Sequence, residues 1–136
     1  MHSQIFVNLP VKDLKRSVDF FTKLGYTFNP QFTDENATCM ILGDNLFAML
    51  LVEKFFASFT SKAICDTSKA TEALTCVACS SREQVDQLVA KARAGGGNIP
   101  RQAQDHGFMY AHGYEDLDGH TWELVHMTGA PPPQNG

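Results

Sequence analysis

Two side chains near the end of the chain could do acid–base or metal chemistry together. Residues 113–127 carry turn-forming residues from Asp116 to Gly119 between two runs rich in aromatic and β-branched residues, a pattern that predicts a β-hairpin. If the turn spans these four residues, the register places His112 opposite Glu123. A carboxylate beside an imidazole can bind a divalent metal or move a proton. The same spacing also suits a solvent-exposed surface pair with no chemistry.

Alternation along these two strands would divide the hairpin into a polar face and a face that can pack. Successive side chains of a strand point to opposite sides of the sheet. We therefore expect Tyr110, His112, Thr121 and Glu123 on the polar face, and Trp122, Leu124 and His126 on the packed face.

The elements that must position these residues come from a chain of 136 residues, which suits one domain or two small fused modules. Hydrophobic residues make up 43%, enough for a core, and the formal net charge is −4. The lack of a basic run argues against a nucleic-acid partner. No apolar run is long enough to span a membrane, and the N-terminus lacks the features of a signal peptide. We therefore expect a cytoplasmic protein.

The cysteine spacing invites a redox or zinc interpretation, which we reject. Cys76 and Cys79 form a C-x-x-C inside an apolar run that predicts a strand, where residues three apart face opposite sides. A redox pair needs a helix N-terminus, and a zinc site needs further ligands. We expect Cys39, Cys65, Cys76 and Cys79 to be small buried hydrophobes in a reducing compartment.

Hydrophobic periodicity divides the chain into two similar halves. In the first half, Asp13 is suited to cap a helix that ends at Gly25. In the second half, Ser80 or Ser81 caps a helix that ends at the glycine run 95–97. The expected strands are 5–11, 26–28, 37–42 and 46–52 in the first half, and 74–79, a short one beginning at Asn98 and Ile99, 108–115 and 120–127 in the second.

Each half thus has the order β-α-β-β-β, which predicts an α+β fold of two tandem βαβββ modules. The helices align at an offset of about 67 residues and the hairpin turns at about 74. We expect modules at 1–54 and 73–128, a linker or flap at 55–72, and a disordered tail at 129–136.

The connecting segment carries three phenylalanines, Phe55, Phe56 and Phe59. They could form a flap over a pocket, a small satellite core or anchors of a protein interface. The sequence leaves these alternatives open.

Two stretches resemble a known family. Residues 11–21, VKDLKRSVDFF, with the following Leu24-Gly25-Tyr26, and residues 115–124, EDLDGHTWEL, are similar to the vicinal oxygen chelate superfamily of glyoxalase I, bleomycin-resistance proteins and extradiol dioxygenases. The second stretch resembles the D-P-D-G-x-x-x-E hairpin of that family, with Leu117 in place of proline. The resemblance implies that each sheet curls into a cup, that helices lie outside, and that the cleft often closes in a homodimer.

The resemblance also implies a metal ligand on the first and on the last strand of each module. Glu123 matches the last-strand ligand of the second module, whereas its counterpart in the first module is Met49, a poor ligand for hard ions. We therefore expect no cofactor, although a divalent metal held by Glu123 with His112 is possible. On the first strand, the corresponding positions are Phe6 and Asn8 in the first module. Their counterparts in the second module, at the offset of about 67 residues, are Ala73 and Thr75. None of these four residues is His or Glu.

Three functions compete. The first is a metal-independent binder of a small organic ligand, similar to bleomycin-resistance proteins. The second is a lyase, isomerase or dioxygenase-type enzyme, in which Glu123 is a metal ligand or the general base and His112 is a ligand or the acid. The third is a partner-binding dimer with a vestigial cleft. The expected cleft residues are Phe6, Asn8, Met49, Thr75, Tyr110, His112 and Glu123.

Overall fold

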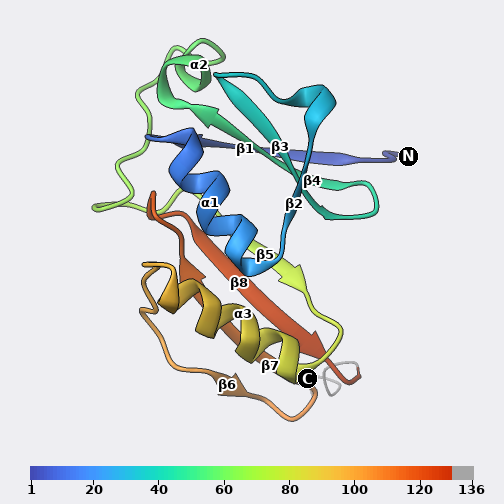
Figure 1. Ribbon diagram of the computed structural model, residues 1–136. Helices are drawn as coiled ribbons and strands as arrows, with labels where there is room; N and C mark the ends of the chain where they lie inside the picture. The colour runs from blue at the N-terminus through green and yellow to red at the C-terminus, as the bar shows by residue number, and fades with distance from the viewer. Residues whose placement is uncertain (130–136) are drawn as a thin grey trace, which may run out of the picture. The chain divides into compact units, whose positions relative to one another are not determined.

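The computed structural model describes residues 1–129 as two four-stranded mixed sheets, each contacted by one long helix (Figure 1). The chain divides into two compact units, Met1–Ala70 and Thr71–Gly136. Most of the predicted linker at 55–72 belongs to the first unit. The predicted tail lies, apart from Gly129, outside the described residues.

The first unit has the predicted order of elements. Its sheet has the strand order β1-β4-β3-β2, with β1 and β4 parallel and the other pairs antiparallel. The elements are β1 (Ile5–Val11), α1 (Leu14–Leu24), β2 (Thr27–Asn29), η1 (Pro30–Phe32), β3 (Ala37–Gly43), β4 (Leu46–Val52) and α2 (Glu53–Ala57).

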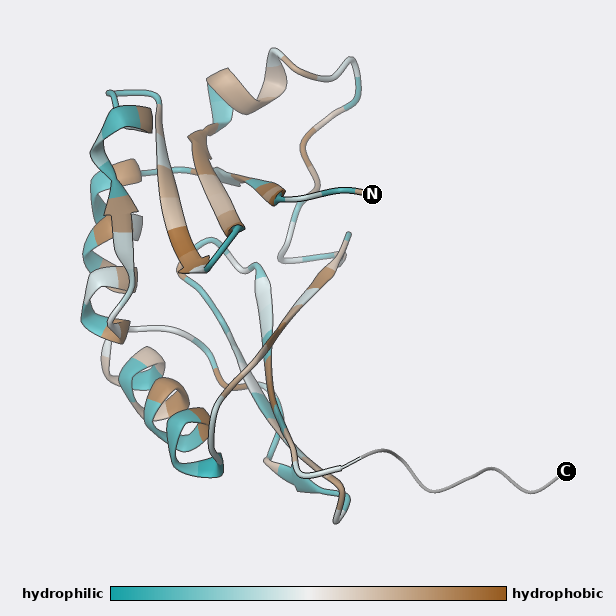
Figure 2. Cartoon of the chain, turned by 90° about the vertical axis from the view of Figure 1, so that its right-hand side faces the viewer, coloured by the Kyte–Doolittle hydropathy of each residue, from teal (hydrophilic) through white to brown (hydrophobic). Residues whose placement is uncertain are grey.

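Helix α1 begins and ends at the predicted residues. The Asp13 side chain accepts a hydrogen bond from the backbone N–H of Arg16 at 3.1 Å. Gly25 ends the helix in the left-handed conformation, with φ of 104°. The helix buries Phe20 and Phe21 in the core of this unit. Both long helices carry hydrophilic and hydrophobic residues, as amphipathic helices do (Figure 2).

The second unit repeats this topology, with strand order β5-β8-β7-β6 and β5 parallel to β8. Ser81 caps α3 by accepting a hydrogen bond from the backbone N–H of Gln84 at 3.0 Å. The α+β fold of two tandem βαβββ modules is therefore confirmed. The elements are β5 (Leu74–Ala78), α3 (Arg82–Ala94), β6 (Gln104–Asp105), β7 (Met109–Glu115) and β8 (Thr121–Met127).

The short strand expected at Asn98 and Ile99 is wrong. Asn98 forms a single bridge with Glu115, and the chain then leaves the sheet until β6 at Gln104–Asp105. Pro100 has no N–H to donate and cannot continue a regular ladder. The segment from Pro100 to β6 is therefore free to stand away from the sheet.

The expected turn of the last hairpin is also wrong, by one residue. The backbone N–H of Asp116 bonds to the His120 carbonyl at 3.0 Å, so only three residues form the loop. Gly119 takes the left-handed conformation that such a loop requires, with φ of 80°. Consequently Glu115 pairs with Thr121 instead of His120.

This one-residue shift moves side chains to opposite faces of the sheet. Glu123 pairs with Gly113, whereas His112 pairs with Leu124. The predicted facing pair of His112 and Glu123 does not form, because the two side chains start from opposite sides of the sheet.

All four cysteines are free, but only Cys39 is buried. Cys65 and Cys76 are exposed, which contradicts the expectation for them. Cys65 lies in the irregular segment after α2, and Cys76 lies on β5 at the edge of its sheet. Cys79 is half-buried just beyond that strand.

The phenylalanine cluster after β4 is partly exposed. The rings of Phe55 and Phe59 contact each other edge to face, with centroids 5.1 Å apart. Phe59 is 69% exposed, so the three residues do not form a buried satellite core.

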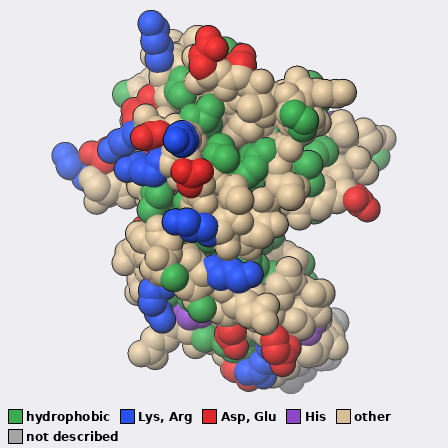
Figure 3. All heavy atoms as spheres, in the orientation of Figure 1, with side chains coloured by type: hydrophobic (Ala, Val, Ile, Leu, Met, Phe, Trp, Pro, Cys, Tyr) green, Lys and Arg blue, Asp and Glu red, His purple; other side chains and the backbone are tan. Residues whose placement is uncertain are grey.

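Acidic and basic side chains are interspersed on the face drawn in Figure 3. None of the helices in residues 1–129 is long and apolar enough to cross a membrane.

Candidate functional site

A pocket of about 320 Å³ lies on the face of the second sheet that turns away from α3. The Tyr110 hydroxyl donates a hydrogen bond to Asp86 of α3 at 2.6 Å, so the even-numbered side chains of β7 point toward the helix. The odd-numbered ones point toward the pocket. The residues that line it are Cys76, Pro100, Arg101, Gln102, Gln104, His106, Met109, Ala111, His112, Gly113, Tyr114, Thr121, Trp122, Glu123 and Val125.

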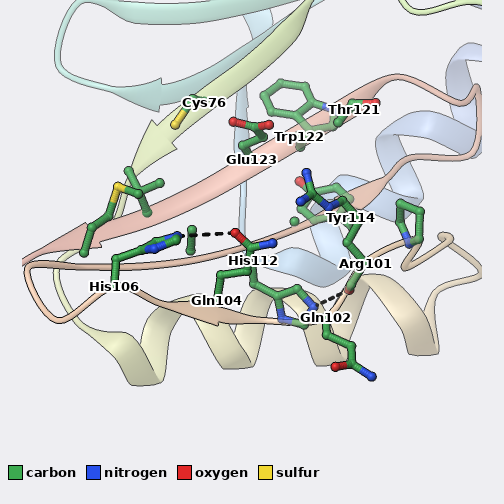
Figure 4. A pocket seen from close by; sticks show the side chains of 15 residues that line it. Cys76, Arg101, Gln102, Gln104, His106, His112, Tyr114, Thr121, Trp122 and Glu123 are labelled. Atoms are coloured by element: carbon green, nitrogen blue, oxygen red, sulfur yellow. Dashed lines mark hydrogen bonds between the residues drawn. The ribbon is translucent and has the colours of Figure 1, made fainter.

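Glu123 occupies a row that crosses three strands, with Cys76 on one side and Gly113 on the other. Its carboxylate is half-exposed and forms no hydrogen bond or ion pair with any residue between 1 and 129. Cys76 and Glu123 lie on the same side of β8 (Figure 4). A carboxylate held on a strand without a protein partner is free to bind a ligand group.

Gly113 leaves the space beside Glu123 open. A Cβ at this position would lie 2.6 Å from the backbone carbonyl oxygen of Trp122. Because that contact is with backbone, neither strand could yield easily. Glycine is therefore required here for the close approach of β7 and β8.

The thiol of Cys76 is a neutral neighbour of Glu123. Although the Cys76 residue is exposed, partial desolvation by neighbouring atoms raises the pKa of its thiol above the ordinary value, and the charge of Glu123 raises it further. The thiol therefore keeps its proton at neutral pH and adds no second negative charge to the pocket.

The outer wall of the pocket is the segment between Asn98 and His106. Asn98 donates a side-chain hydrogen bond to Glu115 at 2.5 Å. The backbone carbonyl of Arg101 lies 3.0 Å from Nε2 of His112. His112 thus borders the pocket, but its imidazole lies on the other side of β7 from Glu123 and holds the wall (Figure 4).

An interaction with α3 fixes the far end of this wall. Arg82 forms an ion pair with Asp105 at 2.9 Å, and its guanidinium lies 4.3 Å from the centre of the Tyr110 ring. A hydrogen bond from the Gly107 backbone, and then the Arg82 charge, lower the pKa of Asp105. The bond that the Tyr110 hydroxyl donates to Asp86 raises the pKa of Tyr110.

Three expected cleft residues, His112, Tyr110 and Thr75, therefore lie on the opposite side of the sheet from Glu123. Tyr110 points toward α3, and Thr75 pairs with the buried Trp122 on the face that packs. The one-residue shift of the hairpin accounts for Tyr110 and His112. Thr75 was expected from the 67-residue offset between the helices, whereas the residue that neighbours Glu123 as Asn8 neighbours Met49 is Cys76, one residue further along.

The three expected cleft residues of the first unit do share one face. Asn8 pairs directly with Met49 across β1 and β4, and Phe6 stacks on Phe47 with ring centroids 4.8 Å apart. Alternation places Phe6, Asn8 and Met49 on the same side of that sheet.

The donor atoms at the positions that the resemblance assigns to a metal do not fit a hard divalent ion. The paired first and last strands offer Asn8 with Met49 in one unit, and Cys76 with Glu123 in the other. A thioether and a protonated thiol are poor partners for such an ion. In the described part of the chain, no three His, Cys, Asp or Glu side chains are grouped so that they could hold a metal.

The sequence reasoning missed Arg101, Gln104 and Cys76 as lining residues. Pro100 was a usable signal that the strand after α3 is interrupted. Gly119 also allowed a three-residue loop, the alternative that gives the observed register. Nothing local pointed to Arg101.

Comparisons with known proteins agree with this fold. Residues 4–43 match the family described as bleomycin resistance protein-like N-terminal. The structure of hypothetical protein SA1046 from S. aureus is 25% identical, with a TM-score of 0.78, over 92% of this chain and 94% of that one. Among curated proteins, none matches this chain.

More distant structures share the fold. A glyoxalase/bleomycin resistance protein/dioxygenase from Nocardioides is 22% identical, with a TM-score of 0.72, over 100% of this chain and 91% of that one. The fosfomycin resistance protein FosX from Mesorhizobium loti is 12% identical, with a TM-score of 0.69, over 94% of each chain. These findings confirm that the chain resembles the vicinal oxygen chelate superfamily, in its first module by sequence and in both modules by fold.

Proposed function

We propose that this protein binds a small organic ligand in the pocket of its second unit and does so without a metal ion. The observation that carries the proposal is the unpaired Glu123 carboxylate within a pocket of about 320 Å³. Clefts of this size are typical of small-molecule sites.

The lining suits a ligand that is mostly apolar. Met109, Ala111 and Val125 offer apolar surface on the open face of the sheet, and Thr121 adds a hydroxyl. Apolar surface supplies affinity, whereas a few polar groups fix the orientation of the ligand. Glu123 is the natural anchor for a cationic or hydroxyl group.

The same carboxylate supports an enzyme as the second candidate. Glu123 in an apolar-lined pocket could act as a general base beside a carbonyl group. His112 is poorly placed as its acid, because its imidazole lies beyond β7 (Figure 4). His106, which lines the pocket, is the alternative.

A screen by melting temperature tests the proposal. A ligand that binds only the folded state raises the melting temperature in a concentration-dependent way. We expect organic compounds to stabilise the wild type and Glu35→Gln, which makes the same change at an exposed loop residue. Glu123→Gln should lose most of this stabilisation.

The metal arm of the same experiment uses zinc, nickel, manganese and iron. We expect no stabilisation that depends on Glu123. Near-stoichiometric metal that Glu123→Gln abolishes would overturn the metal-free proposal. Organic compounds that stabilise Glu123→Gln as well as the wild type would overturn the proposed site.

We also propose a homodimer, because the resemblance implies that a second chain closes the cleft. Sedimentation equilibrium should give twice the mass of the chain. A monomer at micromolar concentration would contradict this proposal without affecting the pocket.

A further inference from the structure

The pocket contains two opposite charges that no group within residues 1–129 neutralises. Among its lining residues, Arg101 and Glu123 are the only Arg, Lys, Asp or Glu side chains. Neither side chain forms a hydrogen bond or ion pair with a residue in the described part of the chain, and they do not pair with each other. Arg101 participates only through its backbone carbonyl, which lies 3.0 Å from His112 Nε2.

The two charges belong to one site. Arg101 and Glu123 both line this pocket (Figure 4). One pair of neutral polar side chains nearby is already engaged, since Gln104 Oε1 lies 3.3 Å from His106 Nε2. The side chains of Met109, Ala111 and Val125 add apolar surface to the same lining.

We propose that the ligand is amphoteric: a small molecule with an amine that Glu123 binds, an acidic group that Arg101 binds, and an apolar body between them. This inference rests on the proposed function and names its ligand class. A guanidinium binds a carboxylate or phosphoryl group through a planar, two-pronged arrangement of donors. The protonated thiol of Cys76 leaves Glu123 as the sole negative charge available to the amine.

The segment that carries Arg101 is held in place from two directions. The contact between His112 and the Arg101 carbonyl fixes it from β7, and the ion pair of Arg82 with Asp105 fixes its far end from α3. His112 is therefore a positioning residue: it orients the residue that binds the acidic group and does not contact the ligand itself.

Four compounds with one aromatic skeleton test the inference. They are 4-(aminomethyl)benzoic acid, with both charges, 4-methylbenzylamine, with the cation, 4-methylbenzoic acid, with the anion, and 4-methylbenzamide, with neither. Calorimetry measures the affinities, and chemical shifts of the pocket amides locate the binding. 4-(Aminomethyl)phenylacetic acid covers a longer separation of the charges. We expect the better of the two zwitterions to bind at least tenfold more tightly than either singly charged compound.

Variants should separate the contributions of the amine and of the acidic group to the tighter binding of the zwitterion. Glu123→Gln should lower the affinity for the zwitterion and the amine but leave that for the acid unchanged. Arg101→Gln should do the reverse. His112→Ala should weaken the acid and the zwitterion by less than Arg101→Gln. Arg93→Gln, at an exposed position of α3, is the matched control and should change nothing.

The outcomes separate the two proposals. If all four compounds shift the pocket amides with equal affinity, the ligand is not amphoteric, while small-molecule binding stands. If the zwitterions bind best but neither variant lowers their affinity, the charge assignment is wrong. If no compound shifts the pocket amides at millimolar concentration, both the ligand class and the proposed site are overturned.

Discussion

The two units have the same strand order but different chemistry on their open faces. The row across the first sheet contains Asn8, Met49 and Cys39. The corresponding row of the second sheet contains Cys76, Glu123 and Gly113. Topology therefore repeats, whereas the carboxylate and the glycine that leaves space beside it occur in the second row and not in the first.

The edge strands differ as well. In the first unit, β2 pairs with β3 over three consecutive residues, Thr27–Asn29. In the second unit, the chain touches β7 at Asn98, departs near Pro100 and returns at β6. This departure builds the outer wall of the pocket. An interrupted edge strand thus supplies a binding wall that a regular strand would not.

The largest expected effect tests the close approach of the strands in the second unit. Gly113→Ala places a Cβ against the Trp122 carbonyl at 2.6 Å and should lower the free energy of unfolding by about 2–3 kcal/mol. Gly43→Ala is the control in the first unit, because its Cβ meets only the end of the Leu46 side chain at 3.4 Å. It should cost less than about 1 kcal/mol.

Urea unfolding measures both variants. Trp122 is the only tryptophan of the chain, so its fluorescence reports the second unit, and circular dichroism reports both units. Equal losses for Gly113→Ala and Gly43→Ala would contradict the view that backbone contact makes the second hairpin special.

A buried carboxylate holds the turn of the second hairpin. Asp116 accepts hydrogen bonds from the backbone of Asp118 and His120 and from Trp122 Nε1, at 2.9, 3.0 and 3.0 Å. Asp116→Ala leaves the indole N–H buried without its acceptor, at a cost of about 2 kcal/mol. In the first unit, Asp34 makes two similar bonds at an exposed turn, and Asp34→Ala should cost less. Comparable losses would show that burial does not matter here.

The pH dependence of this carboxylate has a defined sign. Burial raises the pKa of Asp116 above its ordinary value, while the charge of His120, the Trp122 bond and two backbone bonds oppose this effect. A raised pKa means that the folded state holds the proton more tightly. The stabilisation is therefore complete below about pH 3.9, the unfolded value, and is lost as pH rises through the folded pKa. Asp116→Ala should remove this decline from the unfolding curve.

The helix caps allow a smaller and more symmetrical comparison. Asp13→Ala and Ser81→Ala each remove a side-chain acceptor at a helix N-terminus and should cost about 1 kcal/mol. Ser81→Ala should move the fluorescence transition of Trp122, whereas Asp13→Ala should move only the transition of the first unit. If Asp13→Ala shifts the fluorescence equally, the two units unfold as one.

The smallest effect concerns the thiol beside Glu123. Glu123→Gln removes the lesser of the two causes that raise the pKa of Cys76. The rate at which iodoacetamide alkylates Cys76 at pH 8 should therefore increase severalfold at most, because the thiolate reacts. The rate at exposed Cys65 should not change. An unchanged rate at Cys76 would mean that Glu123 points away from it.

Local signals in the sequence were sufficient for most of the fold. Alternation predicted β1 and β4 at their observed bounds, and Asp13 and Gly25 predicted the ends of α1. The order βαβββ in both halves followed from the same patterns. Each of these signals acts within a few residues, so neighbours in the chain are enough to interpret it.

The candidate site was only partly predictable. Glu123 and His112 do border the pocket, but the expected register made them partners, whereas they lie on opposite sides of β7. The sequence allowed both a four-residue and a three-residue turn. Only the completed hairpin, with Asp116 bonded to His120 and Gly113 against the backbone of β8, decides between them.

The amino-acid sequence by itself determined the elements, their order and the presence of a carboxylate on the last strand. Only the tertiary structure decided on which face of the second sheet Glu123 lies, and that Arg101 lines the same pocket. The physical reason is the separation in sequence of the residues that make contact: helix caps and periodicity depend on residues only a few positions apart. Register and pocket walls depend on pairings between residues that are distant in sequence, where a shift of one residue reverses every side chain.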